Sequence, residues 1–100
     1  MRRRVQLTAN AASQLDSLIG THHLPADSRV RVARLLRPLV LFPEMGAALE
    51  PGARSPGLRF LLGPWRWMLI VYIIVGDRVV VVAIEDGRNS NAVTAGRQRP

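Results

Sequence analysis

Two long β-prone runs separated by only two residues constrain the fold of this chain more than any other feature. The first extends from Trp65 to Val75 and the second from Arg78 to Glu85, and both are rich in Val and Ile. Gly76-Asp77 joins them, and a two-residue connection that begins with Gly favours a type II′ turn, whose first central residue has positive φ. The sequence therefore predicts an antiparallel β-hairpin.

The second of these runs is apolar on both of its faces. The segment Val79–Ile84 contains no polar residue, whereas a strand with one solvated face alternates apolar and polar residues. We therefore expect this strand to be central in its sheet and covered on both sides. Two helices in a chain of 100 residues cover one face of a sheet but hardly both, so the pattern indicates that a partner protein covers the second face.

The amino-terminal part predicts a strand followed by a helix. Val5-Gln6-Leu7 alternates as a strand does, and Thr8 is suited to cap a helix that runs toward Ile19 and stops at Gly20. One face of this helix is apolar and carries Ala11, Leu15, Leu18 and Ile19. The polar residues that point mostly elsewhere are Asn10, Ser13, Gln14 and Asp16. We expect the apolar face to pack against a sheet.

A second helix is predicted to begin after Asp27, as its N-cap, and to run through Arg37 or somewhat beyond. Its apolar face carries Val32, Leu35, Leu36, Leu39 and Val40, and its opposite face carries Arg31, Arg34 and Arg37. Pro38 lacks an N–H and its ring meets the carbonyl group of Arg34, so we expect a kink or an early end there.

The rest of the chain divides into a loop, a strand and a tail. From Pro43 to Gly57 the density of Pro and Gly predicts an irregular connection, and Leu58–Leu62 is a short strand candidate. One hundred residues is the size of a single cooperative domain. We expect that domain to span residues 1–100, with an ordered core over about 4–88 and a polar tail over 89–100.

Charge and composition restrict the partners and the compartment. All fourteen cationic residues are Arg, and the net charge of +7 favours acidic partners such as nucleic acid or an acidic protein. Most of the excess lies at the two ends, because residues 5–96 carry nine Arg against seven Asp or Glu. A chain without Cys has no disulfides and fits a reducing cytosol.

Neither a secretory signal nor a membrane span is expected. Met1-Arg2-Arg3-Arg4 is followed by polar and alternating residues rather than by a long apolar stretch. The longest apolar run, Trp67–Val75, has nine residues, well short of the roughly 20 that cross a bilayer as a helix. We therefore expect a cytoplasmic protein with no membrane partner.

The sequence predicts neither a metal site nor a cofactor. His22 and His23 are adjacent, lack the i, i+4 spacing of a helical metal site, and are the only His residues. No Ser/His/Asp set or phosphate loop stands out. Tyr72 lies in mid-strand among Ile and Val, where burial with a satisfied hydroxyl group is expected rather than catalysis.

The order of strand, helix, helix and three-stranded meander resembles the RelE/ParE toxin family over roughly residues 4 to 88. The stretches that carry the resemblance are Val5–Thr8 with Ala11 and Leu15, Leu39–Gly46 with Phe42-Pro43, Gly57-Leu58-Arg59, Leu69–Tyr72, Gly76–Val81 and Asp86-Gly87-Arg88. The resemblance implies an α+β fold in which the N-terminal strand and a three-stranded antiparallel meander form one sheet, with both helices on one face.

Activity differs within this family. RelE-like members cleave messenger RNA on the ribosome, whereas ParE-like members poison DNA gyrase. Leu69 stands where many nuclease members carry an Arg, Asp86 stands where many relatives carry a His, and no aromatic general acid or base follows Arg88. A carboxylate at Asp86 would repel a phosphate group, so the resemblance favours the ParE-like activity.

We therefore expect the toxin of a type II toxin-antitoxin system, a ParE-like plasmid stabilisation protein that arrests growth by poisoning gyrase and is neutralised by a cognate antitoxin. One alternative is a ribosome-dependent mRNA endoribonuclease in which Arg59 and Arg88 stabilise phosphate charge. Another is a non-toxic relative that only binds an antitoxin.

The candidate target-binding residues are Arg59, Arg66, Arg88, Trp65 and Trp67, and the candidate antitoxin-binding residues are Arg31, Arg34 and Arg37. Trp65 and Trp67 fall on one face of the predicted strand, where they could stack on a base or seat a partner helix, although packing is the commoner role. The three Arg residues are also what any amphipathic surface helix shows. Asp86 is close enough in sequence to pair with Arg88.

Overall fold

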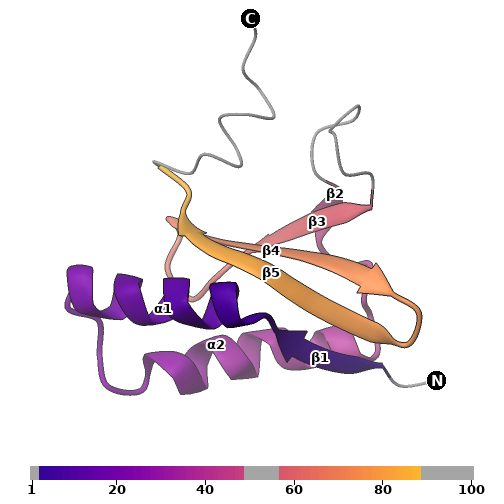
Figure 1. Ribbon diagram of the computed structural model, residues 1–100, viewed down its shortest axis with the longest axis horizontal. Helices are drawn as coiled ribbons and strands as arrows, with labels where there is room; N and C mark the ends of the chain where they lie inside the picture. The colour runs from indigo at the N-terminus through magenta and orange to yellow at the C-terminus, as the bar shows by residue number, and fades with distance from the viewer. Residues whose placement is uncertain (1–2, 49–56, 89–100) are drawn as a thin grey trace, which may run out of the picture.

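The chain folds into a five-stranded mixed sheet with two helices packed on one of its faces (Figure 1). The computed structural model describes residues 3–48 and 57–88, so the predicted tail and the middle of the predicted loop lie outside the described residues. In chain order the elements are β1 (Arg4–Leu7), α1 (Ala9–Thr21), α2 (Ser28–Leu36), the 3-10 helix η1 (Arg37–Val40), β2 (Ala47–Ala48), β3 (Leu58–Leu62), β4 (Met68–Val75) and β5 (Arg78–Asp86).

The sheet contains the predicted meander but is wider than predicted. Strands β3, β4 and β5 pair antiparallel in sequence order, and β1 joins parallel to β5, with Val5 opposite Val79. The full order is β1-β5-β4-β3-β2, which confirms that β5 is internal. Strand β2 was not predicted, because Ala47 and Ala48 lie in a stretch rich in Pro and Gly and pair only through their backbone with β3.

The β4–β5 hairpin is the predicted one. Val75 pairs with Arg78, which leaves Gly76 and Asp77 as the two central residues. Gly76 has a φ of +59°, and His23 is the one non-glycine residue with positive φ among the described residues, so Asp77 has negative φ. Positive φ at the first central position alone is what a type II′ turn requires.

Strand β4 begins later than predicted. It starts at Met68, and the preceding residues form a turn in which the Met68 amide donates to the Trp65 carbonyl oxygen at 2.9 Å. The prediction that Trp65 and Trp67 share one face of a strand is therefore wrong. Gly63 explains the turn, because its amide donates back to the Met68 carbonyl oxygen at 2.8 Å and a Cβ there would lie 2.6 Å from the Met68 sulfur.

Helix α1 begins as predicted and ends later. Thr8 is the N-cap, and its hydroxyl oxygen accepts from the Ala11 amide at 3.0 Å. The helix passes through Gly20, and the left-handed residue that follows it is His23, with a φ of +53°. The His23 amide donates to the Gly20 carbonyl oxygen and the Leu24 amide to that of Ile19. These two bonds form a Schellman motif with His in the place usually held by Gly.

Polar side chains of α1 satisfy the edge of β5 beyond the end of β1. The last residue of β1, Leu7, lies opposite Val81, so β5 runs on without a neighbour on that side. The Ile84 amide donates to the Gln14 side-chain oxygen at 2.8 Å, and the Asn10 amide group donates to the Val82 carbonyl oxygen at 3.4 Å. The expectation that Asn10 and Gln14 point away from the sheet is therefore wrong.

Helix α2 follows the predicted pattern except at its cap. Asp27 is the N-cap residue, but its side chain makes no capping hydrogen bond and pairs instead with Arg31 at 3.1 Å. The α-helix ends at Leu36, and η1 takes up Pro38, which confirms the expected early end.

The core lies between the helices and one face of the sheet. The buried residues that form it are Ala11, Leu15, Val32, Leu36, Leu39, Met68, Ile70, Tyr72, Val79, Val81 and Ile84. On the other face Leu69 and Val71 are buried, whereas Leu62 and Val75 are 52% and 42% exposed. Both helices lie on the opposite side (Figure 1). None of the helices in the described ranges is long and apolar enough to cross a membrane.

Candidate functional site

Arg59 and Tyr72, from neighbouring strands, hold the segment that precedes β2. The Arg59 guanidinium donates to the carbonyl oxygens of Gly46 at 2.8 Å and Glu44 at 3.3 Å. The Tyr72 hydroxyl donates to the Pro43 carbonyl oxygen at 2.7 Å and accepts from the Gly46 amide at 2.9 Å. Tyr72 is fully buried, which confirms its expected packing role. Both side chains therefore fix the backbone of one loop.

A second group of polar and aromatic side chains gathers where α1 ends, β4 begins and β5 ends. Its members contact one another by stacking, cation–π contact or ion pairing. They are His22, Arg31, Trp65, Trp67, Asp86 and Arg88. We call this set the Trp–Arg cluster. It combines candidate residues that the sequence assigned to two different surfaces.

The two indole rings form the centre of the cluster. The ring centroids of Trp65 and Trp67 are 6.3 Å apart with an interplanar angle of 25°. His22 stacks on Trp67 at 4.3 Å. The guanidinium carbon of Arg31 lies 5.7 Å from the Trp65 centroid, and that of Arg88 lies 5.5 Å from the Trp67 centroid. Both distances fall within the range of cation–π attraction, so the rings join a cation from α2 to one from the end of β5.

Asp86 neutralises the Arg88 side of the cluster. Arg88 donates to Asp86 from Nε at 3.0 Å, from Nη2 at 2.8 Å and from its own backbone amide at 3.0 Å. The Arg88 guanidinium hydrogen bonds lower the pKa of Asp86 to about 2, against the opposing effect of burial, with a smaller contribution from His22. His22 Nε2 lies 3.4 Å from Oδ2 of Asp86. The pairing suggested by the sequence is thus observed.

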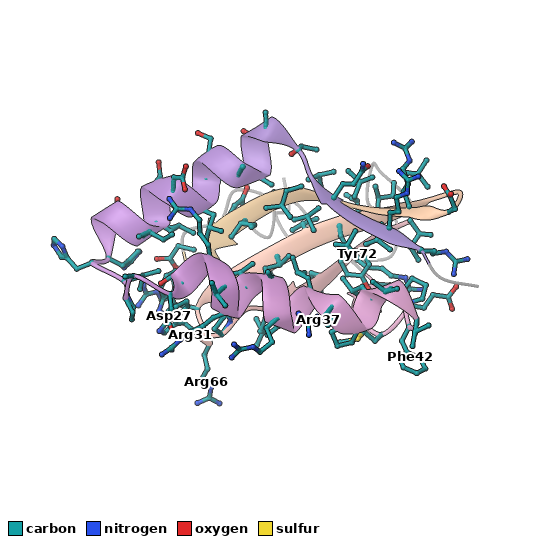
Figure 2. The ribbon with its side chains drawn as sticks, turned by 90° about the horizontal axis from the view of Figure 1, so that it is seen from below. Asp27, Arg31, Arg37, Phe42, Arg66 and Tyr72 are labelled. Atoms are coloured by element: carbon teal, nitrogen blue, oxygen red, sulfur yellow. The ribbon has the colours of Figure 1, made fainter. Side chains whose placement is uncertain are left out.

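The remaining candidate Arg residues are exposed and lie on the α2 side of the molecule. Figure 2 looks onto this side and shows Arg37 on the helix and Arg66 projecting outward beside Asp27 and Arg31. Arg31 is held by Asp27. Arg34, Arg37 and Arg66 are exposed and form no ion pair with another residue in 3–48 or 57–88.

Arg59 and Arg88 do not face a common site. Arg59 lies opposite Tyr72, whereas Asp86, two residues before Arg88, lies opposite Met68. A separation of four residues along β4 corresponds to about 13 Å along the strand. Arg59 also donates to two carbonyl oxygens and Arg88 to a carboxylate, so each cation already has an acceptor.

Sequence reasoning missed the part that His22 plays in the cluster. The sequence pattern offers His22 only as half of a metal motif, and it predicts a helix that stops at Gly20, whereas His22 is the C-cap of α1. A cap two residues further on brings its ring to Trp67 and Asp86. The sequence holds no signal for this contact, since 64 residues separate His22 from Asp86.

Comparisons with known proteins concern the fold. Neither a protein-family model nor a curated protein matches the sequence. The chromosomal ParDE TA system from P. aeruginosa is 16% identical and covers 85% of this chain and 96% of that chain, with a TM-score of 0.66. The archaeal RelE-RelB complex from Pyrococcus horikoshii OT3 is 15% identical and covers 90% of this chain and 100% of that chain, with a TM-score of 0.60. The E. coli DinJ-YafQ toxin-antitoxin complex is 10% identical and covers 88% of this chain and 96% of that chain, with a TM-score of 0.61.

The chain has the RelE/ParE toxin fold. The resemblance drawn from the motifs is thereby confirmed for the α+β architecture with two helices, whereas the sheet has five strands and is mixed rather than limited to the N-terminal strand and a three-stranded meander. Proteins with the RelE/ParE fold differ in what they act on, so the fold does not choose a target.

Proposed function

We propose that this chain is the toxin of a type II toxin-antitoxin system, that it arrests growth by poisoning DNA gyrase, and that a cognate antitoxin neutralises it. The observation that carries the proposal is the fold shared with proteins from a ParDE TA system, a RelE-RelB complex and a DinJ-YafQ toxin-antitoxin complex. The apolar second face of the sheet, with Leu62 and Val75 exposed, supports a protein partner.

The side chains favour gyrase over messenger RNA as the target. Cleavage of RNA needs cations that stabilise the developing phosphate charge and a group that transfers a proton. Arg59 is occupied by two carbonyl oxygens, Arg88 by Asp86, and the Tyr72 hydroxyl is buried between Pro43 and Gly46. A toxin that acts by binding gyrase needs none of this chemistry.

The surface proposed to contact the target is the exposed edge of the Trp–Arg cluster together with Arg66. Arg88 has a side chain that is 60% exposed, and Arg66 is exposed in the turn before β4. Trp65 and Trp67 are half-buried and packed against the core, so they support this surface rather than extend from it. Arg59, in β3, holds the segment before β2 and is not part of this surface.

The experiment is controlled expression of this chain in bacteria, followed by assays of purified gyrase. We expect growth arrest, inhibition of supercoiling and accumulation of cleaved DNA, with all three effects weakened by Arg66→Ala. Arg78→Ala is the matched control, because it removes an exposed Arg at the far hairpin. Gyrase that is unaffected while transcripts are cut at codon-linked positions would reject the proposal in favour of the nuclease. Normal growth with soluble protein would leave a non-toxic antitoxin-binding relative.

A further inference from the structure

The outward side of α2 and η1 carries a stripe of apolar and basic side chains. Val30, Arg34 and Arg37 are spaced by four and three residues, which places them on one face of the helix, and Leu41 and Phe42 follow directly after η1. Val30, Leu41 and Phe42 are 55%, 56% and 63% exposed, the highest values among the exposed large hydrophobic residues of the described chain. We call these five residues the α2 stripe.

The two cations of the stripe differ from their neighbours on the same helix. Arg29 pairs with Asp16 of α1, and Arg31 pairs with Asp27 at 3.1 Å. Arg34 and Arg37 form no ion pair with any part of the chain that the structure describes. The stripe therefore runs from an apolar residue through two unneutralised cations to a pair of apolar residues.

A hollow lies at the carboxyl end of the stripe. It has a volume of about 670 Å³, and its lining residues are Arg3, Leu41, Phe42, Pro43, Glu44 and Met45. Met45 is 50% exposed, so apolar surface continues from the stripe into the hollow. Phe42 lies beyond the end of α2 in Figure 2. A hollow of this size and lining accepts a large apolar side chain.

We propose that the α2 stripe docks an amphipathic helix of the partner protein whose centre is acidic and whose ends are apolar. Carboxylates at the centre of that helix would pair with Arg34 and Arg37, and apolar residues at its ends would cover Val30 and enter the hollow beside Phe42. The span from Val30 to Leu41 is about 17 Å, or about three turns of a partner helix. The identification of the partner as the antitoxin rests on the proposed function.

Charge and exposure together select this occupant. The two unneutralised cations of the stripe, Arg34 and Arg37, favour an acidic partner, and nucleic acid satisfies that condition as well. Nucleic acid would, however, place phosphates against Val30, Leu41 and Phe42 and leave their apolar surface in water. An acidic amphipathic helix satisfies both kinds of side chain. The order of apolar, basic, basic and apolar residues is the same in both directions, so the stripe accepts either orientation.

The test is a titration of the isotopically labelled full chain with a capped helical peptide, followed by NMR. The peptide carries Leu, Glu, Glu and Leu at the spacing of Val30, Arg34, Arg37 and Leu41, and the control peptide carries Lys in place of Glu. We expect saturable shifts along α2 and η1 with the first peptide alone. Arg34→Glu and Arg37→Glu should each weaken binding about fivefold or more, whereas Arg78→Glu, with the same change of charge, should not.

Each other result overturns the docking site. The docking site is rejected if binding does not saturate at about 1 mM peptide or if the Lys peptide binds equally well. It is also rejected if the shifts are confined to the open face of the sheet. A short RNA duplex that needs Arg34 and Arg37 when the peptide does not would assign the stripe to nucleic acid. Peptide binding requires neither growth arrest nor gyrase. A stripe that binds no peptide is therefore distinguishable from a chain that is not a toxin.

Discussion

Gly46 is a position where the chain has no room for a side chain. A Cβ there would lie 2.6 Å from the Tyr72 hydroxyl oxygen and 2.7 Å from the Phe60 carbonyl oxygen. We expect Gly46→Ala to lower the free energy of unfolding by about 2–3 kcal/mol, as measured by urea denaturation. Gly20→Ala is the control, because nothing lies within 4 Å of its added Cβ. That change should raise the free energy of unfolding by about 0.5–1 kcal/mol. Equal effects at the two positions would contradict the claim that Gly46 has no room for a side chain.

His23 is a residue whose backbone conformation does not suit its type. Its φ of +53° is one that side chains with a Cβ adopt at a cost of about 1–2 kcal/mol. His23→Gly should therefore stabilise the chain by about 0.5–1 kcal/mol, since part of the gain is offset by the entropy of Gly in the unfolded chain. His23→Ala keeps the Cβ and should bring no such gain. The measurement is the melting temperature of the two variants in thermal denaturation. A His23→Gly variant that melts below the native chain would argue against the Schellman motif.

At the scale of elements, α1 does for β5 what a neighbouring strand would do. The Ile84 amide has the Gln14 side chain as its acceptor at 2.8 Å. Gln14→Ala removes that acceptor, and an unsatisfied, partly buried amide costs about 1–3 kcal/mol. We expect a loss of about this size in the free energy of unfolding, together with faster hydrogen exchange of the Ile84 amide. Ser13→Ala, at an exposed position of the same helix, should lower neither the free energy of unfolding nor the protection of that amide.

Two other elements show why strand ends are hard to place from a sequence. The run from Trp65 to Val75 is continuous in β-propensity, yet β4 starts at Met68 because the chain reverses between Gly63 and Met68. At Val71 and Tyr72 the register shifts, with partners Ala83 and Val81, so Val82 is an extra residue. Both deviations depend on which backbone groups meet across strands, and apolar periodicity does not encode this.

At the scale of the whole molecule, Asp86 makes stability depend on acid pH. The carboxyl group ties the end of β5 to His22 at the end of α1, and its pKa falls from an ordinary 3.8 to about 2 in the folded chain. A lowered pKa in the folded state means that the stabilisation is complete above about pH 4 and is lost as the pH falls toward 2. The expected loss is about 1 kcal/mol, since the Arg88 side chain is 60% exposed and solvent screens the pair.

Urea denaturation at pH 7 and across pH 2 to 4 measures this dependence. Asp86→Asn should be less stable than the native chain at pH 7 and nearly equal to it at the low end of that range. Asp77→Asn is a control, because it removes a carboxylate that lies exposed at the far hairpin. If Asp86→Asn and the native chain differ in free energy of unfolding by the same amount at every pH, the charge of Asp86 is not the cause of the difference.

Local patterns in the sequence are enough to predict several elements of this fold. The hairpin follows from Gly76 between two β-prone runs, the start of α1 from the Thr8 cap, the break after Leu36 from Pro38, and the central place of β5 from its two apolar faces. The resemblance to RelE/ParE toxins also rested on short motifs, and the fold confirmed it. In each case the cause lies within a few residues of its effect.

The contacts between residues far apart in the sequence follow from tertiary packing. Arg31, His22 and Arg88 contact the two indole rings. Arg59 and Tyr72 both form hydrogen bonds with the segment before β2. Arg34 and Arg37 form no ion pair in the described ranges. These contacts connect residues that are far apart in sequence, and their geometry depends on a helix end and a strand start that each differ from prediction by a few residues. A shift of that size turns a side chain to another direction, so the site follows from packing.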